Sequence, residues 1–378
     1  MRIALFSETF VPQRNGVALI LDRLVRHLAA RGDDVLVATA ETGLDKDAHL
    51  PTSVQLIRSR GMPLPRYPDL RIAAPIAPSV ERAVAEFRPD VIHLVTEYSL
   101  GVVGLRTAKR LGVPAVASFH TNIPRYLPYY GFGWASGLTW RYLKWFHNRA
   151  LFTFCPSEAT RGILLDRGIE RVRIWGRGVD TEQFNPRHRT EQTRRAHGPD
   201  DAVQLLYVGR LTPEKDLAVL FDAYKKVLAA KPKRPVQLVL SGDGAYGPKT
   251  QAAAPKGVTF TGYLEGERLG ATYASADVFV FPSRTETLGN VVLEALASGL
   301  PVVSAADGGV LENVHDGRNG FLCVPGNAES FAARILELVE QPTLRQSLAQ
   351  NARSWAEQRT WEAAFAPLIA GYEEAAAR

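Results

Sequence analysis

The sequence contains very little cysteine and no long apolar run. Its 378 residues include two cysteines, Cys155 and Cys323, which stand far apart. This spacing excludes a disulfide framework or a cysteine-ligated metal cluster, and it favours a reducing cytoplasm. No run of eighteen apolar residues occurs, so we expect no membrane-spanning helix. The opening MRIALFSETF reaches polar residues by position 7, which is not typical of a signal peptide.

Several binding signatures are also absent. The sequence has no aromatic RNA-binding motif, helix-turn-helix pattern or zinc-finger spacing, so we expect no nucleic-acid partner. The first strand-to-helix loop lacks G-x-G-x-x-G, and no acidic residue follows where an adenosine ribose would need one. No DxD pair stands at a strand end. We therefore expect neither a nicotinamide cofactor nor a resident metal ion.

Charge is distributed unevenly along the chain. Residues 1–180 carry 24 Lys and Arg against 16 Asp and Glu, whereas the remainder carries 21 against 23. The basic first half favours contact with something anionic, such as phosphates or a membrane surface.

Short β-branched runs alternate with helical patterns along the whole chain. Continuous apolar strands between helices predict buried parallel sheets covered on both faces. The repetition of this pattern predicts an α/β protein with two doubly wound Rossmann-like domains that face a cleft. Residues 18–32 predict an amphipathic helix with Leu19, Leu24 and Leu28 on one face and a stop at Gly32. The polar, Pro-containing stretch near 180–200 predicts the linker between the domains.

The loops after the predicted strands hold residues suited to phosphate binding. Gly16, in SETFVPQRNGVA, would let backbone amides approach a phosphate, although a glycine in such a loop is often structural. Arg210 and Lys215, in VGRLTPEKDL, lie beside a predicted helix start and suit a diphosphate. The alternative is that both are solvated surface cations.

Two glutamates bracket another predicted helix start. Glu286 lies in the loop after FVFPS, Gly289 and Asn290 begin the helix, and Glu294 lies about one turn inside it. A helix N-terminus attracts anions, so acids there need another purpose. Carboxylates accept hydrogen bonds from sugar hydroxyls, and these two would meet sugars on either side of a diphosphate. His120, in SFHTN, ends a strand of the first half and would face the same cleft, unless it is a satisfied structural histidine.

With these motifs in order, the chain resembles retaining glycosyltransferases of family 4, which have the GT-B fold. The resemblance runs nearly end to end and includes FVPQRNGV, DVIHLVTEYSLG, WGRGVD, SGDG, TGYL, the E-x7-E signature and SGLPVV…GG. It is strongest to the glycolipid branch, which contains sulfoquinovosyl-diacylglycerol synthase and GDP-mannose-dependent α-mannosyltransferases. It implies domains at 1–185 and 186–360, with a final helix at 361–378 that crosses back to the first.

The resemblance also implies roles for the site residues. Glu286 and His120 would be catalytic, holding the transferred sugar and supporting the transition state, and Glu294 would hold the ribose. The remaining donor-binding residues would be Gly16, Arg210, Lys215, Asp243, Gly244, Leu288, Gly289 and Asn290. The first loop departs from the family pattern, because Asn15 replaces the first of its paired glycines.

The implied activity is metal-independent, retaining transfer of a hexose from a nucleotide-diphosphate sugar to an acceptor hydroxyl. The donor could be GDP- or UDP-linked, since no motif separates them. The alternatives are a soluble sugar or polysaccharide acceptor, a nucleotide-sugar epimerase, or a non-catalytic carbohydrate-binding protein.

Residues 125–150 point to the acceptor. This stretch contains nine aromatics, five basic or His residues and no acid. Aromatic residues beside Lys and Arg are typical of membrane-interface segments, although an aromatic core helix with basic edges is the alternative. We expect Trp140, Arg141, Lys144 and Trp145 to meet the membrane or acceptor. The expected enzyme is cytoplasmic, attached peripherally to the inner face of the cell membrane, with a lipid or glycolipid acceptor.

Overall fold

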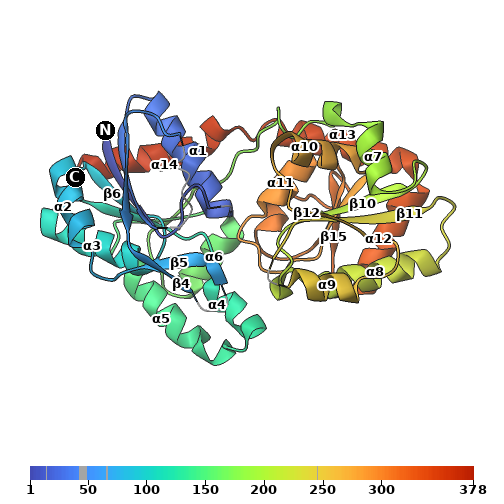
Figure 1. Cartoon of the computed structure of the whole chain (residues 1–378), viewed down its shortest axis with the longest axis horizontal. Helices are drawn as coiled ribbons and strands as arrows, with labels where there is room; N and C mark the ends of the chain where they lie inside the picture. The colour runs from blue at the N-terminus through green and yellow to red at the C-terminus, as the bar shows by residue number, and fades with distance from the viewer. Residues whose placement is uncertain (14, 42–48, 65–66, 245) are drawn as a thin grey trace.

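The computed structural model describes residues 1–13, 15–41, 49–64, 67–244 and 246–378, which fold into two lobes lying side by side (Figure 1). The first lobe is built on a seven-stranded sheet in the order β3-β2-β1-β6-β7-β8-β9, paired in parallel throughout. Its strands in chain order are β1 (Arg2–Ser7), β2 (Asp34–Ala40), β3 (Val54–Ser59), β6 (Val91–Leu94), β7 (Ala115–Ser118), β8 (Thr153–Cys155) and β9 (Val172–Ile174). A separate antiparallel pair consists of β4 (Gly61–Leu64) and β5 (Tyr67–Ala73).

Alternate residues of the central strands face two separate cores. Ile3 and Leu5 of β1 pack with Leu24 of helix α1, whereas Ala4 and Phe6 pack with side chains of α2 and α3. Helices therefore cover both faces of this sheet, as continuous apolar strands predict. The helices of the first lobe are α1 (Gly16–Ala30), α2 (Pro78–Phe87), α3 (Ser99–Leu111), α4 (Ile123–Tyr126), α5 (Ser136–His147) and α6 (Glu158–Asp166), with 3-10 turns η1 (Leu127–Tyr130) and η2 (Gly133–Ala135).

The second lobe repeats the arrangement around a six-stranded parallel sheet in the order β12-β11-β10-β13-β14-β15. Its strands are β10 (Val203–Val208), β11 (Val236–Ser241), β12 (Thr259–Gly262), β13 (Val278–Phe281), β14 (Val302–Ala305) and β15 (Gly320–Cys323). Its helices are α7 (Glu191–His197), α8 (Leu217–Ala229), α9 (Gly247–Ala253), α10 (Gly266–Ser275), α11 (Asn290–Ala297), α12 (Ala328–Glu340) and α13 (Pro342–Ala356), with η3 (Pro186–His188), η4 (Pro213–Lys215) and η5 (Gly308–Glu312). The two sheets confirm the predicted doubly wound α/β class.

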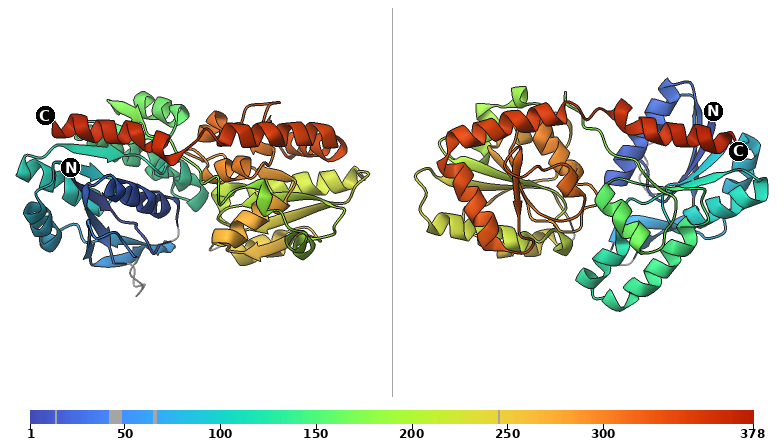
Figure 2. Two further views of the ribbon diagram at one scale, coloured as in Figure 1. Left: turned by 90° about the horizontal axis from the view of Figure 1, so that it is seen from above. Right: turned by 180° about the vertical axis from the view of Figure 1, so that it is seen from behind.

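The last helix, α14 (Trp361–Ala376), follows α13 of the second lobe but lies along the first lobe (Figure 2). Phe365, Leu368 and Tyr372 pack into the core that contains β1 and α1. The Tyr372 hydroxyl lies 2.6 Å from Nδ1 of the buried His93 in β6. The helix thus joins the two lobes by burying apolar surface against the first.

Some local expectations were wrong. Leu19 is half-exposed, because the buried face of α1 runs through Ala18, Leu21 and Leu24 instead. The stretch expected to be a linker contains η3 and α7, and the side chain of Thr190 caps α7. The short strands β4, β5, β9 and β15 were not predicted from the sequence.

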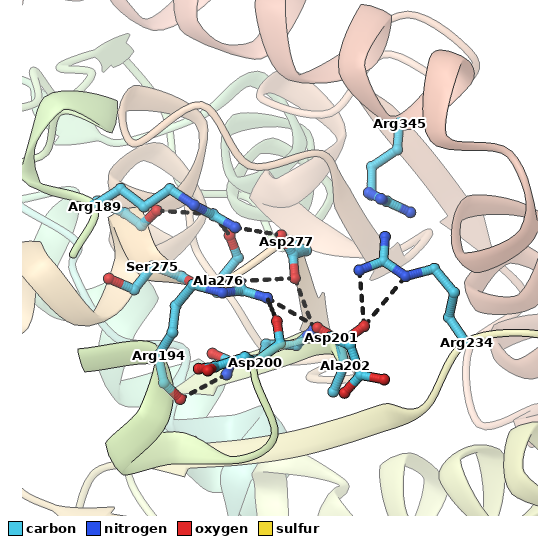
Figure 3. A network of polar contacts seen from close by, with 12 residues as sticks. Arg189, Arg194, Asp200, Asp201, Ala202, Arg234, Ser275, Ala276, Asp277 and Arg345 are labelled. Carbon is cyan, nitrogen blue, oxygen red and sulfur yellow. Dashed lines mark hydrogen bonds and ion pairs between the residues drawn. The ribbon is translucent and has the colours of Figure 1, made fainter. Parts of the chain in front are cut away.

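An arginine network holds α7 against the second sheet (Figure 3). Arg194 donates to the Ser275 carbonyl at 2.8 Å and pairs with Asp277 at 3.1 Å, while Arg189 pairs with the other oxygen of Asp277 at 2.9 Å. Burial alone would raise the pKa of Asp277, but a backbone amide and the two guanidiniums outweigh burial and lower it. These long-range contacts explain why a polar, aperiodic stretch is ordered.

In both sheets the strand order reverses next to the first strand of the lobe, between β1 and β6 and between β10 and β13. In open parallel sheets, ligands bind beyond the carboxyl ends of the strands at such a reversal. The loops after these four strands are therefore where a site is expected. Within the described residues, none of the helices has the length and apolar character needed to span a membrane.

Candidate active site

The two residues predicted to bind a diphosphate and a sugar form a buried ion pair. Lys215 of η4 and Glu286, in the loop after β13, are in direct contact, and the Ser283 hydroxyl donates to the same carboxylate at 2.8 Å. Burial would raise the pKa of Glu286, but Lys215 and Ser283 outweigh it, so the pKa is lowered. Burial would likewise lower the pKa of Lys215, and Glu286 raises it overall. Both groups are therefore charged at neutral pH.

A second carboxylate orients Arg210. Glu214 is fully buried and accepts from Arg210 at 3.1 Å and from the Thr212 hydroxyl at 2.7 Å. Its other oxygen accepts from the hydroxyl of Tyr130, which comes from η1 of the first lobe, at 2.7 Å. About half of the Arg210 side chain is exposed to solvent.

The N-termini of two helices meet between the lobes. A Cβ placed on Gly16, the first residue of α1, would lie 3.6 Å from Nδ2 of Asn290, the first residue of α11. The Asn15 side chain caps α1 by accepting from the amides of Val17 and Ala18. The positive ends of both helices therefore lie close together, which favours an anion there.

Glycines let the loop before α11 approach its neighbours. Gly289 has φ +84°, a left-handed conformation, and Leu288 before it is buried. A Cβ on Gly308 would lie 2.4 Å from the carbonyl oxygen of Glu286, so only glycine fits beside that loop. The amide of Gly309 donates to the same carbonyl at 3.0 Å. The GG pair therefore fixes the backbone that presents Glu286.

Glu294, in the second turn of α11, is partly buried, and no cation among the described residues forms an ion pair with it. Its carboxylate accepts from the Tyr273 hydroxyl of α10 at 2.9 Å. Burial raises its pKa to about 7, although Tyr273 and the more distant Arg23 oppose the shift. Hydroxyl donors suit this carboxylate, and a ribose supplies two.

His120 lies just after the end of β7. One of its ring nitrogens is hydrogen-bonded, and the other has no partner among the described residues. Arg177 donates to its Nδ1 at 2.8 Å. The imidazole packs edge-on against the ring of Trp175, with the two ring centroids 5.3 Å apart. Burial and the Arg177 charge hold its pKa well below the ordinary value, so the imidazole is neutral. Because Nδ1 accepts a hydrogen bond, the proton sits on Nε2, which is buried and has no partner among the described residues. The site therefore offers a donor at Nε2.

Asp243 and Gly244 lie next to the loop that carries Arg210. The amide of Leu211 donates to the Asp243 carbonyl at 2.9 Å, and a Cβ on Gly244 would lie 2.9 Å from the Leu211 carbonyl oxygen. The Asp243 side chain is exposed, and it accepts from the amide of Gly244.

The residues predicted to meet a membrane lie apart from this group, on α5. Trp140 is partly buried and stacks on Phe119 at 6.4 Å, whereas Arg141 and Lys144 are exposed and Trp145 is 40% exposed. An exposed patch of large apolar side chains lies along η2 and α5, consisting of Phe132, Trp134, Leu138, Tyr142 and Trp145.

Three contributors to the site carried no assigned role at the level of sequence: Arg177, Glu214 and Tyr273. Arg177 stands in WGRGVD and Glu214 in TPEKDL, so each had a motif but no visible partner. Tyr273 lies in a helix with no motif, and only the tertiary contact identifies it. In the described part of the chain, no group of three or more His, Cys, Asp or Glu is arranged to hold a metal ion.

Comparison with protein families gives two matches that together cover most of the chain. Residues 14–183 match the family described as Glycosyltransferase Family 4, and residues 189–355 match Glycosyl transferases group 1. The chain is similar to the sulfoquinovosyl transferase SQD2 of Arabidopsis thaliana, at 34% identity over 96% of this chain and 71% of that protein. It is 37% identical to a GDP-mannose-dependent alpha-mannosyltransferase of Mycolicibacterium smegmatis, over 99% of this chain and 97% of that one.

Solved structures share the fold. Sucrose-phosphate synthase from Thermosynechococcus elongatus superposes with a TM-score of 0.79 at 22% identity, covering 99% of this chain and 98% of that one. Anabaena HepE in complex with UDP-glucose gives a TM-score of 0.76 at 22% identity, covering 99% of both chains.

Proposed function

This chain belongs to glycosyltransferase family 4, and on that premise we propose that it transfers a hexosyl group, with retention, from a nucleotide-diphosphate sugar to a hydroxyl of a glycerolipid or glycolipid. Use of a nucleotide sugar is the general property of this class of enzyme. The lipid acceptor is the finer step, and it is supported by the resemblance to the glycolipid branch of family 4 and by the exposed patch on α5.

The observation that carries the donor assignment is the convergence of two cations and two helix N-termini. Arg210, Lys215 and the starts of α1 and α11 would neutralise the charge that develops on the departing diphosphate. Glu294 would accept from the ribose hydroxyls, and Glu286 would accept from hydroxyls of the transferred sugar. With these groups in place, catalysis needs no metal ion.

In the proposed reaction, the bond from the anomeric carbon to the diphosphate oxygen breaks, and the acceptor oxygen bonds to that carbon on the same face. The acceptor proton passes to the departing phosphate oxygen, so the products are a nucleoside diphosphate and a glycosylated acceptor. The Nε2–H of His120 would hydrogen-bond the sugar, and Arg177 keeps the imidazole in that tautomer.

Membrane attachment is proposed to use the patch on η2 and α5. Trp134 is 80% and Leu138 65% exposed, and the basic residues Arg141, Lys144 and Arg149 lie on the same segment. Each basic residue near an anionic surface contributes about 1 kcal/mol of binding, and the aromatic side chains add apolar burial. The enzyme would then work at the cytoplasmic face of the membrane.

Vesicle binding tests this attachment. We expect binding to mixed phosphatidylglycerol–phosphatidylcholine vesicles that weakens with salt, with less binding to phosphatidylcholine alone. Changing both Trp134 and Leu138 to Ala should weaken binding at least about tenfold and reduce transfer to lipid, while donor hydrolysis persists. Changing Leu228, an exposed leucine on α8, to Ala is the matched control. Normal vesicle binding by the folded double variant would contradict the role of the patch.

A further inference from the structure

Several buried polar atoms that have no partner among the described residues lie at the carboxyl end of the first sheet. Gln13 Nε2, Glu97 Oε1, His120 Nε2 and Asn122 Oδ1 are buried and have no hydrogen-bond partner within the described residues. They lie in the loops after β1, β6 and β7, which are adjacent strands. Nearly all buried polar groups in proteins are hydrogen-bonded, so a cluster at the carboxyl ends of neighbouring strands indicates a polar ligand there.

Glu8 and Glu97 lie close together, but only the Glu8 carboxylate is fully used in hydrogen bonds to the protein. Glu8 accepts from the Thr96 hydroxyl at 2.6 Å, the Leu100 amide at 2.6 Å and the Ser99 hydroxyl at 3.0 Å. These bonds fix the loop that joins β6 to α3. Glu97 lies in that loop and is only 4% exposed, yet its Oε1 has no partner among the described residues. Glu8 therefore satisfies the loop, and this oxygen of Glu97 is not used by it.

Glu97 also lies close to the exposed patch on α5. The hydroxyl of Tyr142, which belongs to that patch, donates to the backbone carbonyl of Glu97. Burial raises the pKa of the adjacent Tyr98 phenol, and Arg210 is near enough to oppose that rise. A lipid headgroup bound beside α5 would therefore lie close to this carboxyl.

We propose that Glu97, together with Gln13 and Asn122, forms an acceptor subsite that binds the hydroxyl groups of an uncharged headgroup, such as glycerol or a sugar. This inference rests on the proposed transferase function and names its acceptor class. Gln13 supplies an N–H donor, Asn122 supplies a carbonyl acceptor, and a neutral carboxyl supplies both, which matches a polyol.

The proximity of Glu8 to Glu97 favours an uncharged headgroup over an anionic one. Glu8 and Glu97 are close enough for the charge of Glu8 to raise the pKa of Glu97 further, after burial, to about 8. A headgroup phosphate would be placed beside two acidic side chains and repelled by any ionised form. A hydroxyl-bearing headgroup has no such conflict.

Steady-state kinetics with short-chain lipids test the subsite. The probes are dioctanoylglycerol and its monoglucosyl derivative as neutral acceptors, and dioctanoyl phosphatidylinositol as the anionic one. We expect Glu97→Leu to raise the KM for the neutral acceptors about tenfold or more, since a buried hydrogen-bonding group is lost. Glu97→Gln should raise it less than about threefold, because it preserves a neutral polar group. Donor KM and donor hydrolysis should stay within about twofold of the unchanged enzyme in both variants.

Two further variants keep the test decisive. Asn122→Ala removes a side chain that makes no capping bond to α4, and it should also raise acceptor KM if Glu97→Leu does not fold. Ser298→Ala removes an equally buried, unpartnered oxygen at the far end of α11 and should leave acceptor KM unchanged. The proposal is overturned if the folded variants keep a normal acceptor KM, or if phosphatidylinositol is the preferred acceptor. A lack of donor turnover in the unchanged enzyme would instead count against the transferase function itself.

Discussion

Glu286 and Glu294 are eight residues apart and both partly buried, but their surroundings shift their pKa values in opposite directions. Glu286 contacts a buried ammonium group and has a lowered pKa, whereas Glu294 contacts a neutral phenol and has a pKa of about 7. The first is therefore ionised at neutral pH beside the proposed diphosphate site, and the second gains or loses its proton near neutral pH. The sequence spacing alone treats them alike, because it shows neither partner.

Glu294→Gln should weaken donor nucleotide binding about tenfold, because a charged acceptor for the ribose becomes neutral.

The same substitution should also change how the stability of the protein depends on pH. The folded pKa, about 7, is above the ordinary value of 4.5, so this group's contribution is fully present below about 4.5 and is lost as pH rises through 7. Glutamine does not titrate, so the variant does not lose stability in this pH range for this reason. Chemical denaturation should therefore show the variant gaining ~1 to 3 kcal/mol on the original protein between pH 5 and pH 8, and a pH-independent difference would contradict the assignment.

The Lys215–Glu286 pair gives a second prediction. Lys215→Met or Glu286→Leu alone leaves a buried charge unpaired and should lower the free energy of unfolding by about 3 kcal/mol. The double variant removes both charges, so its unfolding free energy should return to within about 1 kcal/mol of the original, while transfer stays abolished in all three. Denaturant unfolding measures the free energies of unfolding, and an activity assay measures the loss of transfer. A double variant as unstable as the sum of the singles would mean that the pair stabilises the fold through other contacts.

At the scale of elements, the strongly apolar strands were predictable and the short or partner-dependent elements were not. β2 coincides with DVLVATA, since a buried parallel strand leaves a continuous apolar run. β9 and β15 are three and four residues long, too short to carry a pattern of their own. Helix α7 depends on Arg194 reaching Asp277, a contact between residues far apart in the sequence. The site loops that the resemblance implies stay a prediction, and the Oε1 of Glu97, which has no partner among the described residues, depends on the tertiary surroundings and could not be read from the sequence.

Asp277→Asn tests how α7 is held. The aspartate accepts from Arg189, Arg194 and the Gln204 amide, so its neutralisation should cost about 3 kcal/mol of unfolding free energy. Asp222→Asn, at an exposed pair with Lys225, is the control and should change stability by less than about 0.5 kcal/mol. Equal effects of the two substitutions would show that the arginine network does not stabilise the second lobe.

At the scale of the whole molecule, the site exists only where the lobes meet. The first lobe contributes the start of α1, His120 and Tyr130, and the second contributes Arg210, Lys215 and the E-x7-E pair. Direct contacts join them, including the Thr287 hydroxyl donating to the His120 carbonyl at 3.0 Å and the Tyr130 hydroxyl donating to Glu214. The sequence predicted two facing domains, and the boundary at 185/186 stays a prediction. The contacts across the lobes were not predictable, because they join segments more than eighty residues apart.

The most direct test is incorporation of labelled sugar into lipid. Purified protein with excess EDTA and membrane lipid vesicles would be given a panel of labelled GDP- and UDP-sugars in turn, and label would be measured in the organic-solvent-soluble product. We expect at least one donor to label the lipid with full activity in EDTA, because Arg210, Lys215 and two helix N-termini neutralise the leaving group. A strict need for added Mg²⁺ or Mn²⁺, or label that never enters lipid with any donor, would contradict metal-independent transfer to a lipid acceptor.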